Sequence, residues 1–537
     1  MFISKKKLKT PGTYSVQLVE SNRVAGKVKQ TIIQYIGYAQ NEAELKDLVN
    51  LGEQVKSQIL NHNPPDKEIK SYLNKQLSKI KGCSINIHAC EELYRKIIGI
   101  HDVYLQVLKF LNLYNFIENS EYNEILRHII MARIYRPSSK RHSAQLLQTD
   151  FAVNIHLDQI YRALDKIDDD IIASIKHRVY QSSNRLLKNG IKVLFYDATT
   201  LYFESFQSDE LRQNGYSKDL KFNQPQVVLT VLVTNEGLPI GYEVFSGSTY
   251  EGHTLQTAIE TINQNYKDIE MVLVADSGML NQDNIAYLET KNIKYILGAR
   301  LKNQTKKVTA QILSFNASED KEAYKIIELN ENKSLVVSYR EIRAKKDKHD
   351  REKAIERLKK KLEKAKDPKS LLSNYGHKKF ICMTGDTVLS INEAKITAEE
   401  KWDGLHGVIT NIKGLPPDEI YYHYRGLWQV EDAFRVNKTD LRIRPIYHWT
   451  PQKVKAHLAI SYIAFSCVRT LQYLLKEQGH NISCKEITYN LSRVISSVWQ
   501  DRSTNKNYCM PSKPSDTAAT IYKAISVAWD TTPYELA

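Results

Sequence analysis

Cysteines are few in this sequence, and their spacing excludes the common sites that are built from them. Six occur among 537 residues, and no two are separated by just two residues. A zinc knuckle or a redox pair needs such close spacing, and a disulfide-stapled domain needs a denser set. We therefore expect reduced thiols, as in a cytosolic protein.

Long apolar runs and several enzyme motifs are also missing. The sequence has no run of about 18 apolar residues, the length of a membrane-spanning helix, and its first segment, MFISKKKLK, has no apolar core of a signal peptide. It contains no GxxxxGK phosphate loop, no HExxH zinc motif and no GxSxG nucleophile elbow. We expect a cytoplasmic protein with no membrane partner, outside these three enzyme classes.

Positive charge is what the sequence has in excess. Lys and Arg number 76 against 61 Asp and Glu, for a net charge of +15 with His neutral, and the isoelectric point is near 9.1. This balance favours a polyanionic partner, nucleic acid before any other. The length indicates about two to four domains.

Composition and periodicity predict an α/β (α+β) protein in five parts. They are an N-terminal β-hairpin and helix (1–62), a helical region (63–190) that the family resemblance given below implies to be DNA-binding, a core in two pieces (191–300 and 412–480), a β-rich insertion (301–411) and a helical C-terminal region (481–537). The first boundary follows from the pair Pro64 and Pro65.

The core contains strand-like runs in the order β-β-β-α-β-α-β, which describes a mixed sheet of the ribonuclease-H kind. The first run, IKVLFYDAT, carries Asp197 at its end, and the fourth, IEMVLVADSG, carries Asp276. These strands are neighbours in such a sheet, so we expect both carboxylates at one edge. Each aspartate alone is more often an ordinary turn or cap residue.

Residues 421–445 combine an acid with aromatic and basic residues. With 100° per residue, one helix face carries, within about 80°, Tyr424, Trp428, Glu431, Arg435 and Lys438. One interpretation is a packed helix with a solvated mixed-charge face. The other joins Glu431 to the two aspartates, since clustered carboxylates need a cation between them and hard oxygen ligands favour magnesium or manganese. Two such ions about 3.5–4 Å apart serve phosphoryl transfer.

Two basic segments lie outside this group of acids. Lys140 and Arg141 occupy the first turn of a helix that Ser138 or Ser139 can cap. Cations there oppose the helix dipole, and a bound phosphate would relieve the conflict; a solvated helix start is the equal alternative. The charge run 340–369 fits a solvent-exposed helix better than a DNA-facing one.

Several motifs together resemble the DDE transposases of bacterial insertion sequences, in the insertion-sequence-four group and most of all its sixteen-thirty-four branch. They are LFYDATTLYFES around Asp197, GYSKDLKFNQPQVVLTVLV at 215–233, LVADSGMLNQDNIAYL around Asp276, and the stretch 421–445. RIYRPSSKR, DQIYRALDKI and the helix start KAHL extend the resemblance over nearly the whole chain.

The group carries a signature of Tyr, two residues, Arg, three residues, Glu, six residues and Lys. Tyr424, Glu431 and Lys438 fill three of its places, but Leu427 stands in the place of the Arg. Arg435 lies on the stripe of the acid and is the better geometric replacement. The resemblance implies that Asp197, Asp276 and Glu431 are the catalytic metal ligands. The residues expected to contact DNA are Tyr424, Arg425, Trp428, Arg435, Lys438, Lys140 and Arg141.

The resemblance also implies an activity. It is that of a transposase with two Mg²⁺ ions, for which Mn²⁺ can substitute, that binds the terminal inverted repeats of an insertion sequence and target DNA. It would cleave and transfer DNA strands as a homodimer across paired ends, in the bacterial cytoplasm and on the nucleoid when bound. The alternatives are a catalytically inactive DNA-binding repressor derived from a transposase, and a nuclease of the same superfamily.

Overall fold

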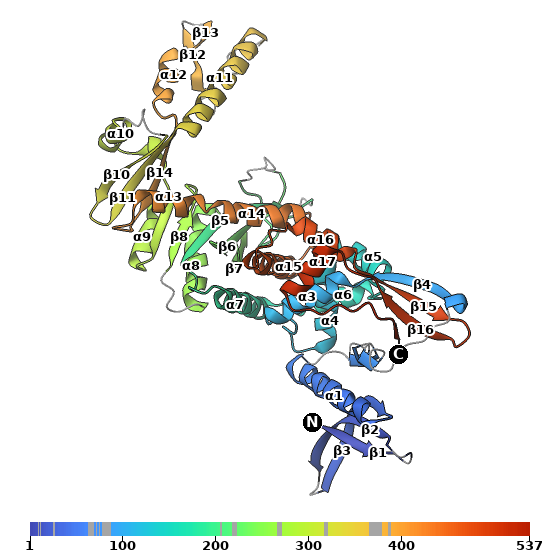
Figure 1. Cartoon of the computed structure of the whole chain (residues 1–537). Helices are drawn as coiled ribbons and strands as arrows, with labels where there is room; N and C mark the ends of the chain where they lie inside the picture. The colour runs from blue at the N-terminus through green and yellow to red at the C-terminus, as the bar shows by residue number, and fades with distance from the viewer. Residues whose placement is uncertain are drawn as a thin grey trace.

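The protein is a mixed α/β structure built around one large sheet (Figure 1). The computed structural model describes residues 1–8, 10, 12–24, 27–62, 69, 70, 72–74, 76, 77, 87–204, 207–216, 223–265, 271–315, 321–364, 379–384 and 388–536. The predicted boundary at Pro64 and Pro65 lies outside these residues, as do 217–222 of the second transposase-like motif.

A three-stranded antiparallel sheet and one helix form the N-terminal part. The residues predicted as a hairpin form β2 (Tyr14–Val24) and β3 (Lys27–Ala39), and β1 (Phe2–Lys7) adds a strand that the pattern did not predict. Helix α1 (Glu42–His62) packs on this sheet through a small apolar cluster of its own.

Five helices follow, and one predicted helix is wrong. The helices are α3 (Gly99–Phe110), α4 (Ser120–Tyr135), α5 (Lys140–Phe151), α6 (Leu157–Leu164) and α7 (Asp169–Leu186). Before them, CEELYRKI forms the strand β4 (Cys90–Ile97) although its residues favour a helix. It is a strand because it pairs along its whole length with a strand some 400 residues later in the chain.

That partner belongs to the C-terminal region, whose predicted helical character is also corrected. The sheet has the order β17-β16-β15-β4, with β15 (Ile495–Asp501), β16 (Lys506–Pro511) and β17 (Tyr534–Glu535). Helices α16 (Cys484–Ser492) and α17 (Asp516–Ala524) precede and follow the β15–β16 hairpin. The strand β4, which begins at Cys90, therefore shares one sheet with the C-terminal strands, while β1, β2 and β3 form a separate sheet (Figure 1).

The central sheet has eight strands in the order β10-β11-β14-β9-β8-β5-β6-β7. Its middle strands, β5 (Val193–Tyr202), β8 (Val272–Ala275) and β9 (Lys294–Gly298), are parallel. The meander strands β6 (Gln226–Thr234) and β7 (Pro239–Ser246) continue from β5, as the sequence order predicts. Helices α8 (Thr254–Asn265) and α9 (Gln282–Thr290) cover one face.

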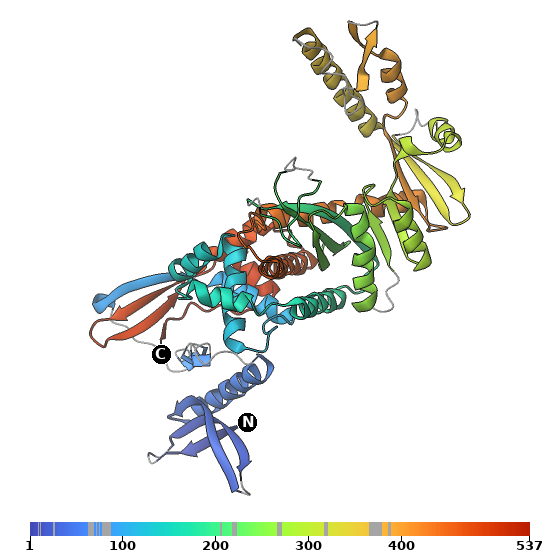
Figure 2. The ribbon, with the colours of Figure 1, turned by 180° about the vertical axis from the view of Figure 1, so that it is seen from behind.

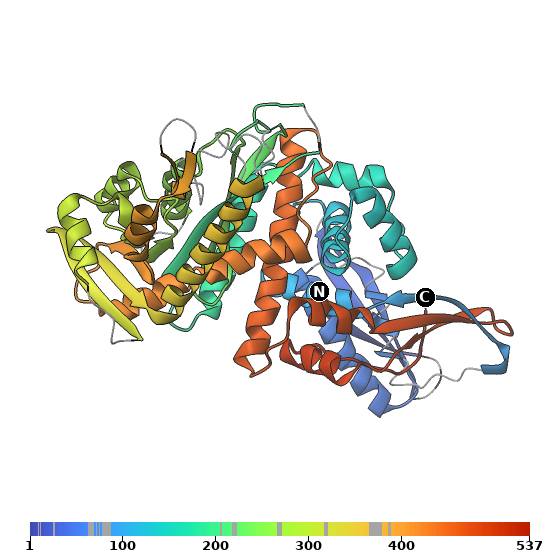
Figure 3. The ribbon, with the colours of Figure 1, turned by 90° about the horizontal axis from the view of Figure 1, so that it is seen from above.

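The predicted insertion contributes strands to this same sheet. β10 (Glu322–Asn330), β11 (Lys333–Arg340) and β14 (Leu405–Thr410) extend it, and β14 pairs with β9. Between β11 and β14 the chain forms an arm of α11 (Glu341–Lys364), β12 (Ile381–Thr384), β13 (Val388–Ile391) and α12 (Glu393–Glu400). The arm projects beyond the sheet (Figure 2), and from above α11 crosses in front of the strands (Figure 3).

The opposite face of the central sheet is covered by α13 (Pro417–Arg425), α14 (Trp428–Arg435) and α15. Helix α15 (Pro451–Glu477) is long and apolar enough to cross a membrane, but 89% of its most apolar window is buried within the protein. It packs with α3, α4 and the odd-numbered residues of β5 in one core. This burial accounts for its composition as that of a core helix.

Candidate active site

Asp197 and Asp276 occupy matching positions on neighbouring parallel strands. The last paired residues of β5 and β8 are Tyr196 and Ala275, so each aspartate is the next residue along its strand. Asp276 follows the end of β8, as predicted. Asp197 does not end its strand, because β5 continues to Tyr202 through its pairing with β6.

Both aspartates belong to the face that carries α14. Alternation along β5 places Phe195 in the core shared with α14 and α15, whereas Tyr196 and Ala198 face α8 and α9. Asp197 therefore shares the side of Phe195. Each carboxylate accepts a nearby backbone N–H at 2.7 Å, from Ala198 for Asp197 and from Gly278 for Asp276.

The stretch 421–445 is not one helix. It forms α13 (Pro417–Arg425), α14 (Trp428–Arg435) and a π-helical turn over Val436–Asp440. A two-residue turn at Gly426 and Leu427 separates α13 from α14, and both residues keep right-handed helical backbone angles. A Cβ added to Gly426 would lie 2.2 Å from Cζ of Phe195, so glycine allows this close approach to the sheet. The π turn changes the residues per turn, which moves Lys438 off the predicted stripe.

A pocket of about 510 Å³ joins Asp276 to Glu431. Tyr424 and Trp428, which share the predicted stripe with Glu431, also line it. Leu427, which stands in the place of the Arg of the signature, lines it as well. Four cations from the sheet extension, α11 and α13 complete the wall: Arg340, Arg343, Lys346 and Arg425. The pocket offers two carboxylates and an aromatic surface inside a positively charged rim.

Tyr424 lies at the centre of this arrangement. Its hydroxyl lies over the end of β9, where a Cβ on Gly298 would meet it at 2.5 Å. Burial, followed by the charge of Asp276, raises the pKa of Tyr424 to about 12, with Glu431 adding to the effect. The phenol therefore stays protonated at neutral pH and can donate a hydrogen bond.

Lys438 approaches the other aspartate. Its ammonium donates a hydrogen bond to the hydroxyl of Thr199, which lies two residues after Asp197 on the same side of β5. The π turn thus places a cation on the face of the sheet that carries Asp197, while Glu431 lies by Asp276.

The remaining predicted DNA contacts have different settings. Trp428 is 56% exposed at the pocket. Arg425 forms an ion pair with Glu322 of β10. Arg435 pairs with Asp432 at 2.6 Å and with Asp440 at 3.6 Å rather than lining the pocket beside Glu431.

A polar contact set fixes α14 against the sheet. Arg469 of α15 donates to the carboxylate of Asp432 at 2.9 Å and to the carbonyl of Gly237 in the β6–β7 turn at 3.0 Å. Gln429 donates to the carbonyl of Asn235 in the same turn at 2.9 Å. Arg469 and Asp432 are mostly buried, so they hold the backbone on which Glu431 stands.

The two residues at the start of α5 differ from each other. Ser139 caps the helix by accepting the N–H of His142, as expected for one of the two serines. Lys140 is buried, with 4% exposure, whereas Arg141 is exposed. The expectation of a solvated helix start is therefore wrong for Lys140.

The acids have the chemistry of a divalent metal site but are not drawn together. Within the described part of the chain, no three His, Cys, Asp or Glu side chains gather closely enough to hold an ion. Asp197, Asp276 and Glu431 nevertheless lie on one side of the sheet, two of them in one pocket. Three carboxylates with no other donor type fit a hard cation, which would offset their mutual repulsion.

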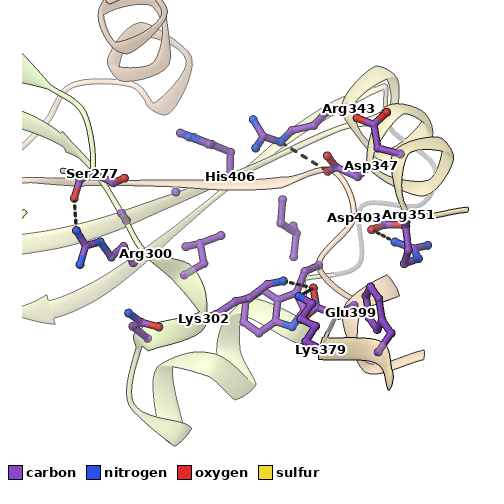
Figure 4. Close-up of a pocket in the computed structure, with 18 residues that line it drawn as sticks. Ser277, Arg300, Lys302, Arg343, Asp347, Arg351, Lys379, Glu399, Asp403 and His406 are labelled. Carbon is purple, nitrogen blue, oxygen red and sulfur yellow. Dashed lines mark hydrogen bonds and ion pairs between the residues drawn. The ribbon is translucent and has the colours of Figure 1, made fainter. Parts of the chain in front are cut away.

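A second pocket, of about 860 Å³, lies on the other side of Arg343 and His406. Figure 4 shows Arg300 pointing at Ser277, the residue after Asp276, and its guanidinium donates to the Ser277 carbonyl at 3.0 Å. Lys302 and Lys379 both contact Glu399 of α12. The arm and the end of β8 therefore share one polar cavity.

His406 makes the site sensitive to acid. Burial, with the nearby Arg343 guanidinium, lowers the pKa of His406 to about 4. Its contribution to stability is present above the ordinary pKa of about 6.5 and is lost as pH falls towards 4, at about 3 kcal/mol at most. Melting curves at pH 7 and 4.5 should show a smaller acid loss for His406→Gln than for wild type. The exposed His480→Gln should behave as wild type; equal acid losses in both variants would contradict this.

Sequence reasoning missed several residues of this site. Arg340, Arg343 and Lys346 belong to the charge run that was interpreted as a solvated helix, and its excess of basic residues was the available signal. Thr199 and Arg469 gave no signal, since their roles depend on contacts across more than 30 residues.

Comparison with known proteins agrees with this geometry. A family model described as "Transposase DDE domain" matches residues 188–467, more than half of the chain. This range contains all three acids, both pockets and the central sheet. No curated protein matches the chain.

Solved structures give weaker likenesses. The chain is similar to piggyBac transposase in a synaptic complex with hairpin DNA, at 9% identity and a TM-score of 0.41 over 73% of this chain and 76% of that one. It is similar to Mos1 transposase in a paired-end complex with the left transposon end, at 11% identity and a TM-score of 0.15, over 34% of this chain and 58% of that one. A Mos1 mariner paired-end complex with Mn is similar at 9% identity and a TM-score of 0.14, over 45% of this chain and 76% of that one. The family match, which implies a ribonuclease-H-like core, shows that the chain belongs to the transposase DDE domain family.

Proposed function

We propose that this protein is a metal-dependent DNA transposase of the insertion-sequence-four group, which cleaves the ends of its element and joins them to target DNA. The observation that carries the proposal is the pocket that Asp276 and Glu431 both line, together with Arg340, Arg343 and Lys346. Asp197 lies one strand away on the same side, in the order Asp, Asp, Glu along the chain.

Asp197, Asp276 and Glu431 would hold divalent cations, Mg²⁺ or Mn²⁺. When bound, such ions activate the attacking oxygen and stabilise the leaving oxygen of a phosphodiester. The family uses divalent metals, in agreement with this donor set. The acids have to draw closer than they are in this structure, which DNA and cations together would favour by screening their charges.

The other residues of the site would bind and orient the DNA end. Arg340, Arg343 and Lys346 attract the backbone and position it without reading sequence. The protonated phenol of Tyr424 donates to a phosphate oxygen, and exposed Trp428 offers a surface on which an unpaired base stacks. Lys438 supplies a cation next to Asp197. Arg425 and Arg435 can join only by leaving their present ion pairs.

The test is cleavage of DNA that carries the inverted repeats flanking this reading frame. With Mg²⁺ or Mn²⁺ we expect nicks at the repeat ends followed by strand joining to a target plasmid, since both steps need the ions. With EDTA we expect neither product, while a gel-shift assay still shows binding to the repeats.

The controls separate the alternatives. A linear DNA of equal length without the repeats should give no specific nicks. Binding to the repeats without cleavage under any metal would favour a DNA-binding repressor, and cleavage without strand joining would favour a nuclease of the same superfamily. Either result would contradict the transposase assignment.

A further inference from the structure

Lys140 is a buried lysine in the first turn of α5. It is 4% exposed, and its ammonium has no hydrogen-bond or ion-pair partner among the described residues. Leaving a charge unpaired in the interior is costly. Burial, followed by the charge of Arg133, lowers the pKa of Lys140 well below its ordinary value. A lysine in this setting is typical of a site that an anion completes.

The lysine lines a small pocket at the start of α5. The pocket has a volume of about 60 Å³, which holds roughly four to six water-sized atoms at about 10–15 Å³ each. Its walls come from two stretches far apart in the chain, 133–161 and 447–457. The lining residues are Arg133, Ser138, Ser139, Lys140, Arg141, Tyr161, Tyr447, His448 and His457. None of these described lining residues is acidic.

Apart from the two tyrosines, every ionisable residue of the pocket wall is basic. Arg133 and Lys140 bring positive charge, and burial lowers the pKa of His448 to about 3 and that of His457 well below its ordinary value, with the two cations adding to both effects. Nε2 of His457 lies 3.1 Å from the carbonyl of Ile443, while its buried Nδ1 has no partner. An anion would reverse the repulsion among these groups.

Backbone geometry adds donors to the same pocket. Helix α5 has 12 residues, and the N–H groups of its first turn have no partner within the helix. The Ser139 hydroxyl accepts the backbone N–H of His142. The backbone N–H groups of Lys140 and Arg141 are therefore left for a ligand. Exposed Arg141 and Tyr447 mark the side from which a ligand enters.

We propose that this pocket binds one phosphate group, either in the backbone of DNA or as free phosphate. A phosphate group has four oxygens, and its charge matches the helix N-terminus and the lysine. The pocket itself stands on the geometry above, whereas its assignment to a DNA phosphate rests on the proposed function. The site lies outside the pocket of Asp276 and Glu431, so it would bind and align the DNA rather than take part in strand cleavage.

The test compares Lys140→Met with Lys188→Met, which removes one exposed lysine at the end of α7. Without ligand, Lys140→Met should melt at the same temperature as wild type or higher, because it removes an unpaired buried charge. Inorganic phosphate, at constant ionic strength set with chloride, should raise the melting temperature of wild type and of Lys188→Met but not of Lys140→Met. If Lys140→Met does not fold, Lys140→Gln replaces it.

Binding to the repeat DNA provides the second readout. Lys140→Met should bind about tenfold more weakly, and its plot of log affinity against log salt should be shallower by about 0.9, one phosphate contact. Equal phosphate protection in Lys140→Met and wild type, or an equal loss in Lys188→Met, would overturn the pocket. Phosphate protection that depends on Lys140, in a protein that binds no repeat DNA, would keep the pocket as a free-phosphate site and reject the proposed function.

Discussion

Asp197→Asn, Asp276→Asn and Glu431→Gln are each expected to abolish cleavage of repeat-end DNA. Each change keeps the shape of the side chain and removes one negative charge from a set that would hold the metal ions. The expected loss of cleavage rate is about 1,000-fold or more, which corresponds to several kcal/mol of transition-state stabilisation. Single-turnover cleavage of end-labelled DNA measures it.

Binding to the same DNA distinguishes lost chemistry from lost structure. All three variants should bind the repeats within about twofold of wild type in EDTA, because removing an acid does not weaken contacts made by cations. Glu419→Gln, an exposed acid in the first turn of α13, is the matched control and should cleave normally. A variant at Asp197, Asp276 or Glu431 that cleaves at the wild-type rate would remove that residue from the site.

Arg469→Met is expected to damage both stability and cleavage. It removes the partner of Oδ2 of the mostly buried Asp432, whose Oδ1 keeps Arg435, and it releases the β6–β7 turn at Gly237. Breaking such a pair costs about 3 kcal/mol, which should appear as a lower urea midpoint. Since Glu431 is next to Asp432, the folded variant should also cleave more slowly at saturating DNA.

A lysine at the end of the same helix controls for the loss of charge. Lys476→Met changes an exposed residue in the last turn of α15 and should leave the urea midpoint unchanged. If Arg469→Met unfolds at the wild-type urea concentration, α14 does not depend on this contact set. A lower midpoint with normal cleavage by the folded fraction would remove Arg469 as a positioning residue for Glu431.

The sequence predicted those parts of the site that depend on residues close together in the chain. The strand-like runs that carry Asp197 and Asp276, with the order β-β-β-α-β-α-β, were enough to place both on neighbouring strands, and these strands are parallel. The division into five parts stays a prediction, although strands of the predicted insertion lie in the central sheet.

Other features depend on partners far along the chain. β4 is a strand because of β15, and Lys140 is buried by His448 and His457, which follow it by some 300 residues. The need for glycine at position 426 reflects the ring of Phe195, and nothing near residue 426 in the sequence indicates that ring. Periodicity treats a helix as an isolated cylinder, so it could not foresee a break imposed by the sheet beneath.

The arm between β11 and β14 has a consequence for redesigning the chain. Its two ends meet, since the N–H of Arg340 donates to the carbonyl of Gly404 at 3.1 Å and the flanking strands pair directly. A short turn can therefore replace residues 341–403 and leave the pairing of all eight strands intact. Tyr421 would keep its hydrogen bonds to the Val336 and His406 carbonyls. Such a shortened chain would keep the acids on the central sheet but would lack α11 and its basic residues. The contribution of α11 to DNA binding could then be measured apart from the positioning of the acids.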